Sequence, residues 1–288
     1  MNSLSAGPGP LIFKLLLVVL AISGCEEDPG CLDVLANNYA VDAEDPCTDC
    51  CSYPELRLSL RHRWIIGDSV RNFPADSSVY KIGNDVVRFE RIRFFLSNLQ
   101  FVRKNGEVLD LLDRLTLSVQ FAGDTIQEDI TDNFTLAEAG SFRTYVPGTY
   151  RGSGAFDKLR FTLGVPSPVA DQSPDQFPAG HPLADEGTNM YTAQNGFAHT
   201  RIAYALPAAD TLIQVLRTGG EQQLVQVELP IALQIDPGFH SEIVLAVDYQ
   251  KWFADLDLAE GEPQEVSAQI VSNQAESFSV VSVLTTLN

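Results

Sequence analysis

The side chains best suited to chemistry in this sequence are a few histidines and one methionine. There are four histidines: His62, His181, His199 and His240. Met190 is the one methionine beyond the initiator. Imidazole nitrogens and a thioether sulfur are ligands that suit copper in an exported protein. Because His181, Met190 and His199 fall within 19 consecutive residues, this segment predicts a metal site made of two imidazoles and a thioether.

Each of these residues also has a structural interpretation. A single histidine is more often hydrogen-bonded in a core or on a surface than bound to a metal. His62 can satisfy its ring inside the core, Met190 can fill space there, and His181 can lie in a loop before Pro182. His240 follows a turn-like stretch, Asp236-Pro237-Gly238-Phe239, and is predicted to lie on the surface.

The N-terminal segment predicts export. Lys14 precedes the apolar run Leu15 to Ile22, which is shorter than the roughly 20 residues that span a bilayer. The run ends Leu20-Ala21-Ile22-Ser23-Gly24-Cys25, which resembles a bacterial lipobox. We therefore expect residues 1–24 to be a signal peptide and Cys25 to be lipidated and anchored to a membrane. Acidic residues follow Cys25 directly, which is typical of lipoproteins displayed at the outer cell surface, and the periplasmic face of the outer membrane is the alternative.

Four further cysteines form a short module. Cys31, Cys47, Cys50 and Cys51 lie in an exported segment, where disulfides are the expected state. Adjacent cysteines rarely bond to each other, so we expect Cys31 to pair with Cys50 or Cys51 and Cys47 with the other.

Two metal-binding alternatives apply to this module. Cys47, Cys50 and Cys51 have a spacing that thiolate metal sites also use. Asp33, Asp42 and Asp45 offer oxygen ligands for calcium, although they lack the spacing and glycine of an EF-hand loop. The prediction remains a disulfide-stapled module over residues 25–54.

Composition and motifs exclude several functions. Acidic residues number 38 against 19 Lys and Arg, and the resulting net charge of -19 argues against a nucleic-acid partner. The sequence contains no Gly-x-Ser-x-Gly elbow, no His-Glu-x-x-His helix and no phosphate-binding or dinucleotide glycine motif. We expect a binding protein and assign no catalytic residues.

Alternating apolar and polar residues predict the fold. The clearest case is the segment beginning at Leu56, in which every second residue through His62 to Ile66 shares one face. A second strand, Arg91 to Val102, is followed by Asn105-Gly106, which predicts a hairpin. Four more segments alternate in the same way, near residues 115–121, 159–165, 225–229 and 243–247. Residues 55–288 are therefore predicted to form one antiparallel β-sandwich in an all-β fold.

The order of motifs along this domain carries a family resemblance. In chain order they are the strand ending at His62, Val87 through Phe94-Phe95-Leu96-Ser97-Asn98-Leu99, Pro147-Gly148-Thr149-Tyr150, Leu159-Arg160-Phe161-Thr162-Leu163-Gly164-Val165, His181-Pro182-Leu183, Met190-Tyr191, Gly196-Phe197 and Val247-Asp248-Tyr249-Gln250-Lys251-Trp252-Phe253. Together they resemble the MbnP-like copper-binding protein family across nearly all of residues 55–288.

This resemblance implies an exported, often lipid-anchored β protein with a role in copper handling. It transfers His62, His181 and Met190 as metal ligands, whereas His199 is suggested by spacing alone. It also implies a partner, a di-haem cytochrome peroxidase-like protein that oxidises a family tryptophan to kynurenine.

The sequence departs from the family at two places. Tyr191 and Ala193 stand where a Trp-x-Trp arrangement is usual, and the only tryptophans are Trp64 and Trp252. The family tends to place a histidine before a glycine where this chain reads Leu216-Arg217-Thr218-Gly219. The main prediction is a lipid-anchored copper-binding protein, and the alternative is a degenerate, metal-free surface interaction or adhesion lipoprotein.

Overall fold

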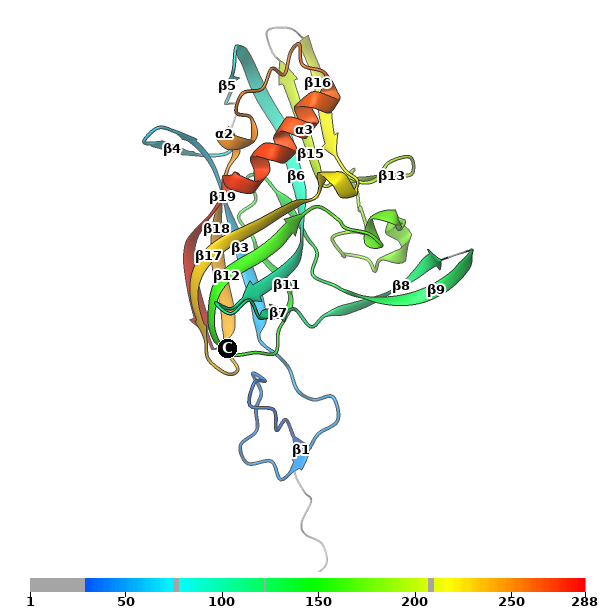
Figure 1. Ribbon diagram of the computed structural model, residues 1–288, viewed down its shortest axis with the longest axis vertical. Helices are drawn as coiled ribbons and strands as arrows, with labels where there is room; N and C mark the ends of the chain where they lie inside the picture. The colour runs from blue at the N-terminus through cyan, green and yellow to red at the C-terminus, as the bar shows by residue number, and fades with distance from the viewer. Residues whose placement is uncertain (1–28, 75–77, 122, 207–209, 288) are drawn as a thin grey trace, which may run out of the picture.

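The computed structural model describes residues 29–74, 78–121, 123–206 and 210–287 (Figure 1). The predicted signal peptide and the predicted lipidation at Cys25 lie outside the described residues. Within the described ranges, no helix is long and apolar enough to cross a membrane.

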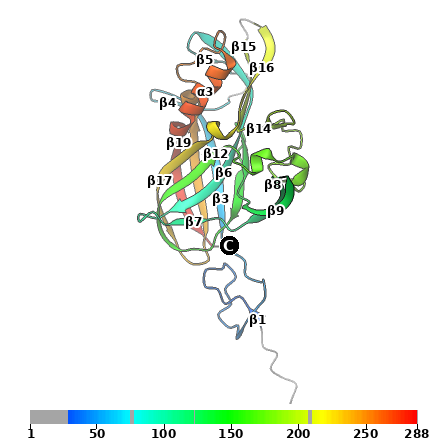
Figure 2. The same ribbon diagram turned by 45° about the vertical axis from the view of Figure 1, so that its right-hand side comes forward.

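Two β-sheets pack face to face, which confirms the all-β sandwich (Figure 2). The strands of the larger sheet are β5 (Tyr80–Ile82), β6 (Asp85–Val102), β7 (Val108–Asp110), β10 (Thr135–Glu138), β12 (Gly154–Leu163), β15 (Thr200–Leu206), β16 (Asp210–Thr218) and β17 (Val225–Ile235). Their main order is β16-β15-β6-β12-β17, and β5, β7 and β10 also pair with β6.

The smaller sheet has the order β11-β3-β18-β19, with β4 paired to β3. These strands are β3 (Glu55–Ile66), β4 (Ser69–Asn72), β11 (Thr144–Thr149), β18 (His240–Asp248) and β19 (Phe278–Thr286). Strand β18 runs parallel to β3, while the other pairs within the two large sheets are antiparallel. The alternation in the sequence predicted the strands but not this parallel partner.

Smaller elements surround the sandwich. The remaining strands are β1 (Pro29–Gly30), β2 (Asp45–Pro46), β8 (Arg114–Phe121), β9 (Asp124–Thr131), β13 (Tyr191–Thr192) and β14 (Gly196–Phe197). The α-helices are α2 (Tyr249–Trp252) and α3 (Pro263–Gln274), and the 3-10 helices are η1 (Val169–Asp171), η2 (Pro174–Gln176), η3 (Glu221–Gln223) and η4 (Ala275–Ser277). Helix α3 packs mainly against α2 and β16 (Figure 1).

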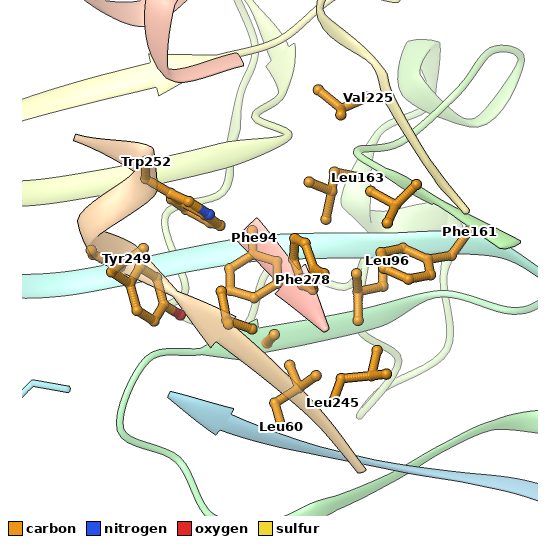
Figure 3. Close-up of a cluster of buried hydrophobic side chains, with 14 of the residues drawn as sticks. Leu60, Phe94, Leu96, Phe161, Leu163, Val225, Leu245, Tyr249, Trp252 and Phe278 are labelled. Carbon is orange, nitrogen blue, oxygen red and sulfur yellow. The ribbon is translucent and has the colours of Figure 1, made fainter. Parts of the chain in front are cut away.

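The main core fills the space between the two sheets. Figure 3 shows Phe94 of β6 near Leu60 of β3 and Leu245 of β18, with Trp252 and Tyr249 of α2 at one end. All five side chains are at most 2% exposed. Since fully burying one large apolar side chain stabilises a fold by about 1.5–3 kcal/mol, this cluster is the main source of stability.

A second apolar cluster, here called the satellite cluster, lies on the outer face of the larger sheet. Phe94 points into the main core, so its neighbour Phe95 points to the opposite face of β6 and belongs to the satellite cluster. The other buried members are Leu117, Val119, Phe134, Leu136, Val165, Val169, Phe177, Leu183, Met190, Phe197 and Ala198. The segment that carries three of the four predicted metal ligands therefore packs outside the sandwich core.

The predicted hairpin after β6 is present. The amide of Gly106 donates to the Arg103 carbonyl, and the amide of Arg103 donates to the Glu107 carbonyl, each at 2.9 Å. Only Gly106, at φ +88°, has a positive φ, and Asn105 does not. The loop is thus five residues long and does not need two left-handed residues.

The cysteine module is stapled and docked beneath the sandwich (Figure 1). Cys31 pairs with Cys51 and Cys47 with Cys50, one of the two arrangements expected. Asp33 of the module forms an ion pair with Arg151 of the sandwich, with 2.6 Å between Oδ2 and Nε. A side chain at Gly238 would meet the Ala36 carbonyl at 3.0 Å, so the absence of one permits this close approach.

Candidate metal centre

His62 is placed in the main core by the alternation of β3. Leu56, Leu58 and Leu60 precede it on the same face, and its side chain is 1% exposed. It lies opposite Val247 of β18, the strand that leads directly into α2. The first residue of α2, Tyr249, therefore reaches the ring, and its hydroxyl lies 2.8 Å from His62 Nδ1.

The other ring nitrogen of His62 has no partner. Nε2 is buried and makes no hydrogen bond of ordinary geometry. Burial lowers the pKa of His62 from 6.5 to about 4, and the nearby Ser141 backbone carbonyl offsets only part of this fall. The ring is therefore neutral at pH 7. When Nδ1 donates to the phenol, Nε2 carries the lone pair that a metal requires.

A buried phenol lies close to this pair. The Tyr145 hydroxyl, on β11, is also buried without a hydrogen-bond partner. Burial raises the pKa of Tyr249 well above its ordinary value, and the nearby Tyr145 adds to the rise. Unpartnered buried polar groups are costly and rare, so the orphaned Nε2 of His62 and the orphaned phenol of Tyr145, both next to Tyr249, mark a place suited to a bound polar species. Tyr145 and Tyr249 were not predicted, because nothing in their sequence spacing relates them to His62.

His181 is fully hydrogen-bonded. Its Nε2 lies 3.0 Å from Asp132, and its Nδ1 accepts from the Leu183 amide at 3.1 Å. The ring also stacks on Phe177, with 5.1 Å between centroids. No lone pair remains free for a metal in this arrangement.

His199 is also fully hydrogen-bonded, in a more buried position. Nδ1 accepts from the Val165 amide at 3.1 Å, and Nε2 donates to the Gly220 carbonyl at 2.9 Å. Burial lowers the pKa of His199, so the ring is neutral. Both nitrogens hold backbone segments together.

Met190 lies in the satellite cluster with its side chain 0% exposed. The cluster brings the three predicted ligands into one region, since His181 stacks on Phe177 and His199 follows Ala198. Among the described residues, however, the one group of three or more His, Cys, Asp or Glu ligand atoms close enough for a metal is Cys47, Cys50 and Cys51. Copper binding by His181, Met190 and His199 stays a prediction.

The prediction for His240 was wrong. This residue begins β18 and is 1% exposed rather than on the surface. Its Nδ1 accepts from the Glu55 amide at 3.0 Å, and its Nε2 is unpartnered. The turn residues before it do cross the surface, but pairing with β3 and β19 buries the first residue of the strand.

The cysteine module contains the close group of sulfur atoms but holds them in disulfides. Cys51 is bonded to Cys31, and Cys47 to Cys50, so none of these four sulfur atoms is available as a thiolate. Among the acids proposed for calcium, Asp33 is already engaged. Its carboxylate accepts from the Leu35 amide, the Tyr53 hydroxyl and Arg151. These contacts satisfy Asp33 without a metal ion. Calcium binding by Asp33, Asp42 and Asp45 stays a prediction.

The two tryptophans that the sequence retains are both internal. Trp64 is 2% exposed and packs on Phe73 and Tyr80. Trp252 is 0% exposed and donates from its indole nitrogen to Ser277 at 2.6 Å. At the position where the family usually has tryptophan, Tyr191 is half-buried with its ring 5.1 Å from that of Phe197.

Comparison with known proteins gives the family. No curated protein matches the chain in sequence. Among solved structures, MbnP from Methylosinus trichosporium is similar at 12% identity, over 73% of this chain and 83% of that chain, with a TM-score of 0.38. The model of the MbnP family matches residues 53–271, which is most of the chain. The chain therefore belongs to the MbnP family.

Proposed function

We propose that this chain is an exported, lipid-anchored copper-binding protein that uses His62 as a ligand. The observation that carries the proposal is the buried, unpartnered Nε2 of His62. Family membership supports copper as the metal. The lipobox-like sequence ending at Cys25 supports a lipid anchor at the outer membrane, on either the cell surface or the periplasmic face.

The core around His62 offers one histidine suited to bind a metal but does not supply a full set of ligands. A histidine ligand is usually a neutral imidazole whose second nitrogen donates to a hydrogen-bond acceptor, and the Tyr249 hydroxyl can be that acceptor for His62. His181 and His199 lie by the satellite cluster on the outer face of the larger sheet with both ring nitrogens hydrogen-bonded, so they do not complete a site at His62. The proposed role is therefore copper binding centred on His62, without catalytic turnover.

A metal-free role is the second candidate. It is favoured by the complete hydrogen bonding of His181 and His199 and by the replacement of the family tryptophans. In that case the chain would act as a surface interaction or adhesion lipoprotein. The di-haem peroxidase-like partner belongs to the first candidate and gains no support from Tyr191.

The test is a copper titration of the purified protein, with Cu(I) under reducing conditions and Cu(II) separately, followed by elemental analysis. We expect stoichiometric binding that is lost in His62→Ala and kept in His181→Ala. Tyr145→Phe tests the second unpartnered group, because the hydroxyl it removes has no hydrogen-bond partner in the fold. A loss of copper in Tyr145→Phe would add that phenol to the site. Wild-type protein that stays metal-free against weak chelators would contradict the proposal and favour the second candidate.

A further inference from the structure

Three arginines lie side by side across the outer face of the larger sheet. Arg93 of β6 is directly opposite Arg201 of β15, and Arg201 is directly opposite Arg217 of β16. Directly opposed residues in antiparallel strands point to the same face, with neighbouring strands about 4.8 Å apart. We call these three residues the arginine row. In Figure 1 the three strands run together in the upper part of the molecule.

The row faces away from the main core. Ile92, Ile202 and Leu216 are neighbours of the three arginines in sequence and belong to the main core cluster. Because side chains alternate along a strand, the arginines must point to the opposite face. The row is thus separated from His62 by the sheet itself.

Two members of the row have structural partners. Arg93 donates to Glu138 at 2.9 Å and to the Thr188 carbonyl. Arg217 donates to the carbonyls of Asn189 and Met190, both at 2.9 Å. These bonds hold the segment 188–190 against the sheet, so Arg93 and Arg217 both have a structural role.

Arg201 has no such explanation. It is half-buried in the middle of the row, and none of the described residues makes a hydrogen bond or ion pair with its side chain. The carboxylate of Glu138 is already shared by Arg91 and Arg93. Asp185 is the nearby opposite charge, and its Oδ1 accepts from Thr188 and from the Met190 amide.

Like charges directly across strands destabilise a sheet. Burial lowers the pKa of Arg201, and the charges of Arg93 and Arg91 lower it further. Burial likewise lowers the pKa of Arg217, with Arg201 adding to the effect. This concentration of positive charge stands out in a chain whose net charge is -19. A guanidinium with five unused donors, flanked by two others, is the donor set that binds oxyanions.

We propose that Arg201, flanked by Arg93 and Arg217, is the centre of a binding site for a small oxyanion, a carboxylate or a phosphate. The anion accepts the free donors of Arg201 and offsets the repulsion within the row. The site is independent of copper and lies on the other face of the sheet from His62.

The test compares thermal stability and calorimetric binding of wild type, Arg201→Gln and Arg160→Gln. Arg160 is the matched control, because it lies on β12 of the same sheet, carries the same charge and pairs with Glu228. The probes are inorganic phosphate and succinate, with dimethyl succinate as the neutral counterpart and sodium chloride to match ionic strength.

Without oxyanions, we expect Arg201→Gln to be at least as stable as wild type, since it removes repulsion. Phosphate or succinate should stabilise wild type and Arg160→Gln, and the two probes show which oxyanion fits better. Affinity should fall at least about tenfold in Arg201→Gln, which corresponds to about 1.4 kcal/mol. The proposal fails if neither anion binds saturably, if Arg201→Gln binds as well as wild type, or if dimethyl succinate binds equally.

Discussion

Acid should destabilise the metal-free protein through His62. Its pKa is about 4 in the fold, against 6.5 for an exposed imidazole. Between these values the unfolded chain binds a proton and the folded chain does not, so the free energy of unfolding falls as the pH drops below 6.5. From about pH 7 to pH 5, this one group removes about 2 kcal/mol of stability. The loss levels off through pH 4, where the folded form is itself half protonated, and it is complete about one pH unit lower.

The assay is denaturant unfolding at several pH values, with a copper chelator present throughout. Fluorescence of Trp64 and Trp252 reports the transition, because both indoles are buried in the fold. His62→Leu should be less stable than wild type at pH 7, since it leaves the Tyr249 hydroxyl without its partner. Its free energy of unfolding should nevertheless fall by about 2 kcal/mol less than that of wild type between pH 7 and pH 5.

A control isolates the proton linkage from the packing change. The double variant His62→Leu with Tyr249→Phe removes the orphaned hydroxyl and should keep the shallow pH dependence of His62→Leu. His199, whose pKa is also lowered by burial, remains in all three proteins and contributes equally to each. Equal pH dependence in wild type and His62→Leu would refute the conclusion that His62 is held neutral by burial.

Three other predictions concern stability. Phe94→Ala should lower the free energy of unfolding by about 3–5 kcal/mol, because it opens a cavity where the ring meets Trp252, and denaturant unfolding measures it. Replacing Cys31 and Cys51 by serine opens a link between residues 20 apart and should destabilise the module by about 3 kcal/mol, seen as faster hydrogen exchange there with little change in the sandwich. Asp33→Asn should loosen the module from the sandwich by weakening its ion pair with Arg151, seen as faster proteolysis near residue 54 without a change in the melting temperature of the sandwich.

The strands could be predicted because their signal is local. Alternation along β3 places Leu56 to His62 on one face whatever the partner strand is. The parallel pairing of β18 with β3 could not be predicted, because it joins residues such as Val247 and His62 that are far apart in the chain. Helix α3 was also missed. Pro263 at its start and the buried pair Val266 and Ile270 are its only clear signals.

The candidate metal ligands show why residue type alone cannot identify a metal site. All four histidines are internal or nearly so, and the difference between them lies in their hydrogen-bond partners. The partners of His199 are the backbone of Val165 and Gly220, which the sequence cannot reveal. The Tyr249 partner of His62 depends on the register of β18 against β3. The sequence nominates candidate ligands, and only the fold separates the two histidines with an unpartnered Nε2, His62 and His240, from the fully hydrogen-bonded His181 and His199.

The departures from the family are connected in the structure. The segment around Met190 and Tyr191 lacks the family tryptophans, and the strand that packs beside it has Arg217 near the place where the family resemblance expects a histidine. Arg217 donates to the carbonyl of Met190. The arginine near the expected histidine position therefore holds in place the backbone of the segment that lacks the family tryptophans. A guanidinium in that place repels a copper ion and attracts an anion. On this argument, the proposed copper ligand His62 lies on the core side of the sheet, and the proposed oxyanion site around Arg201 lies on its outer side.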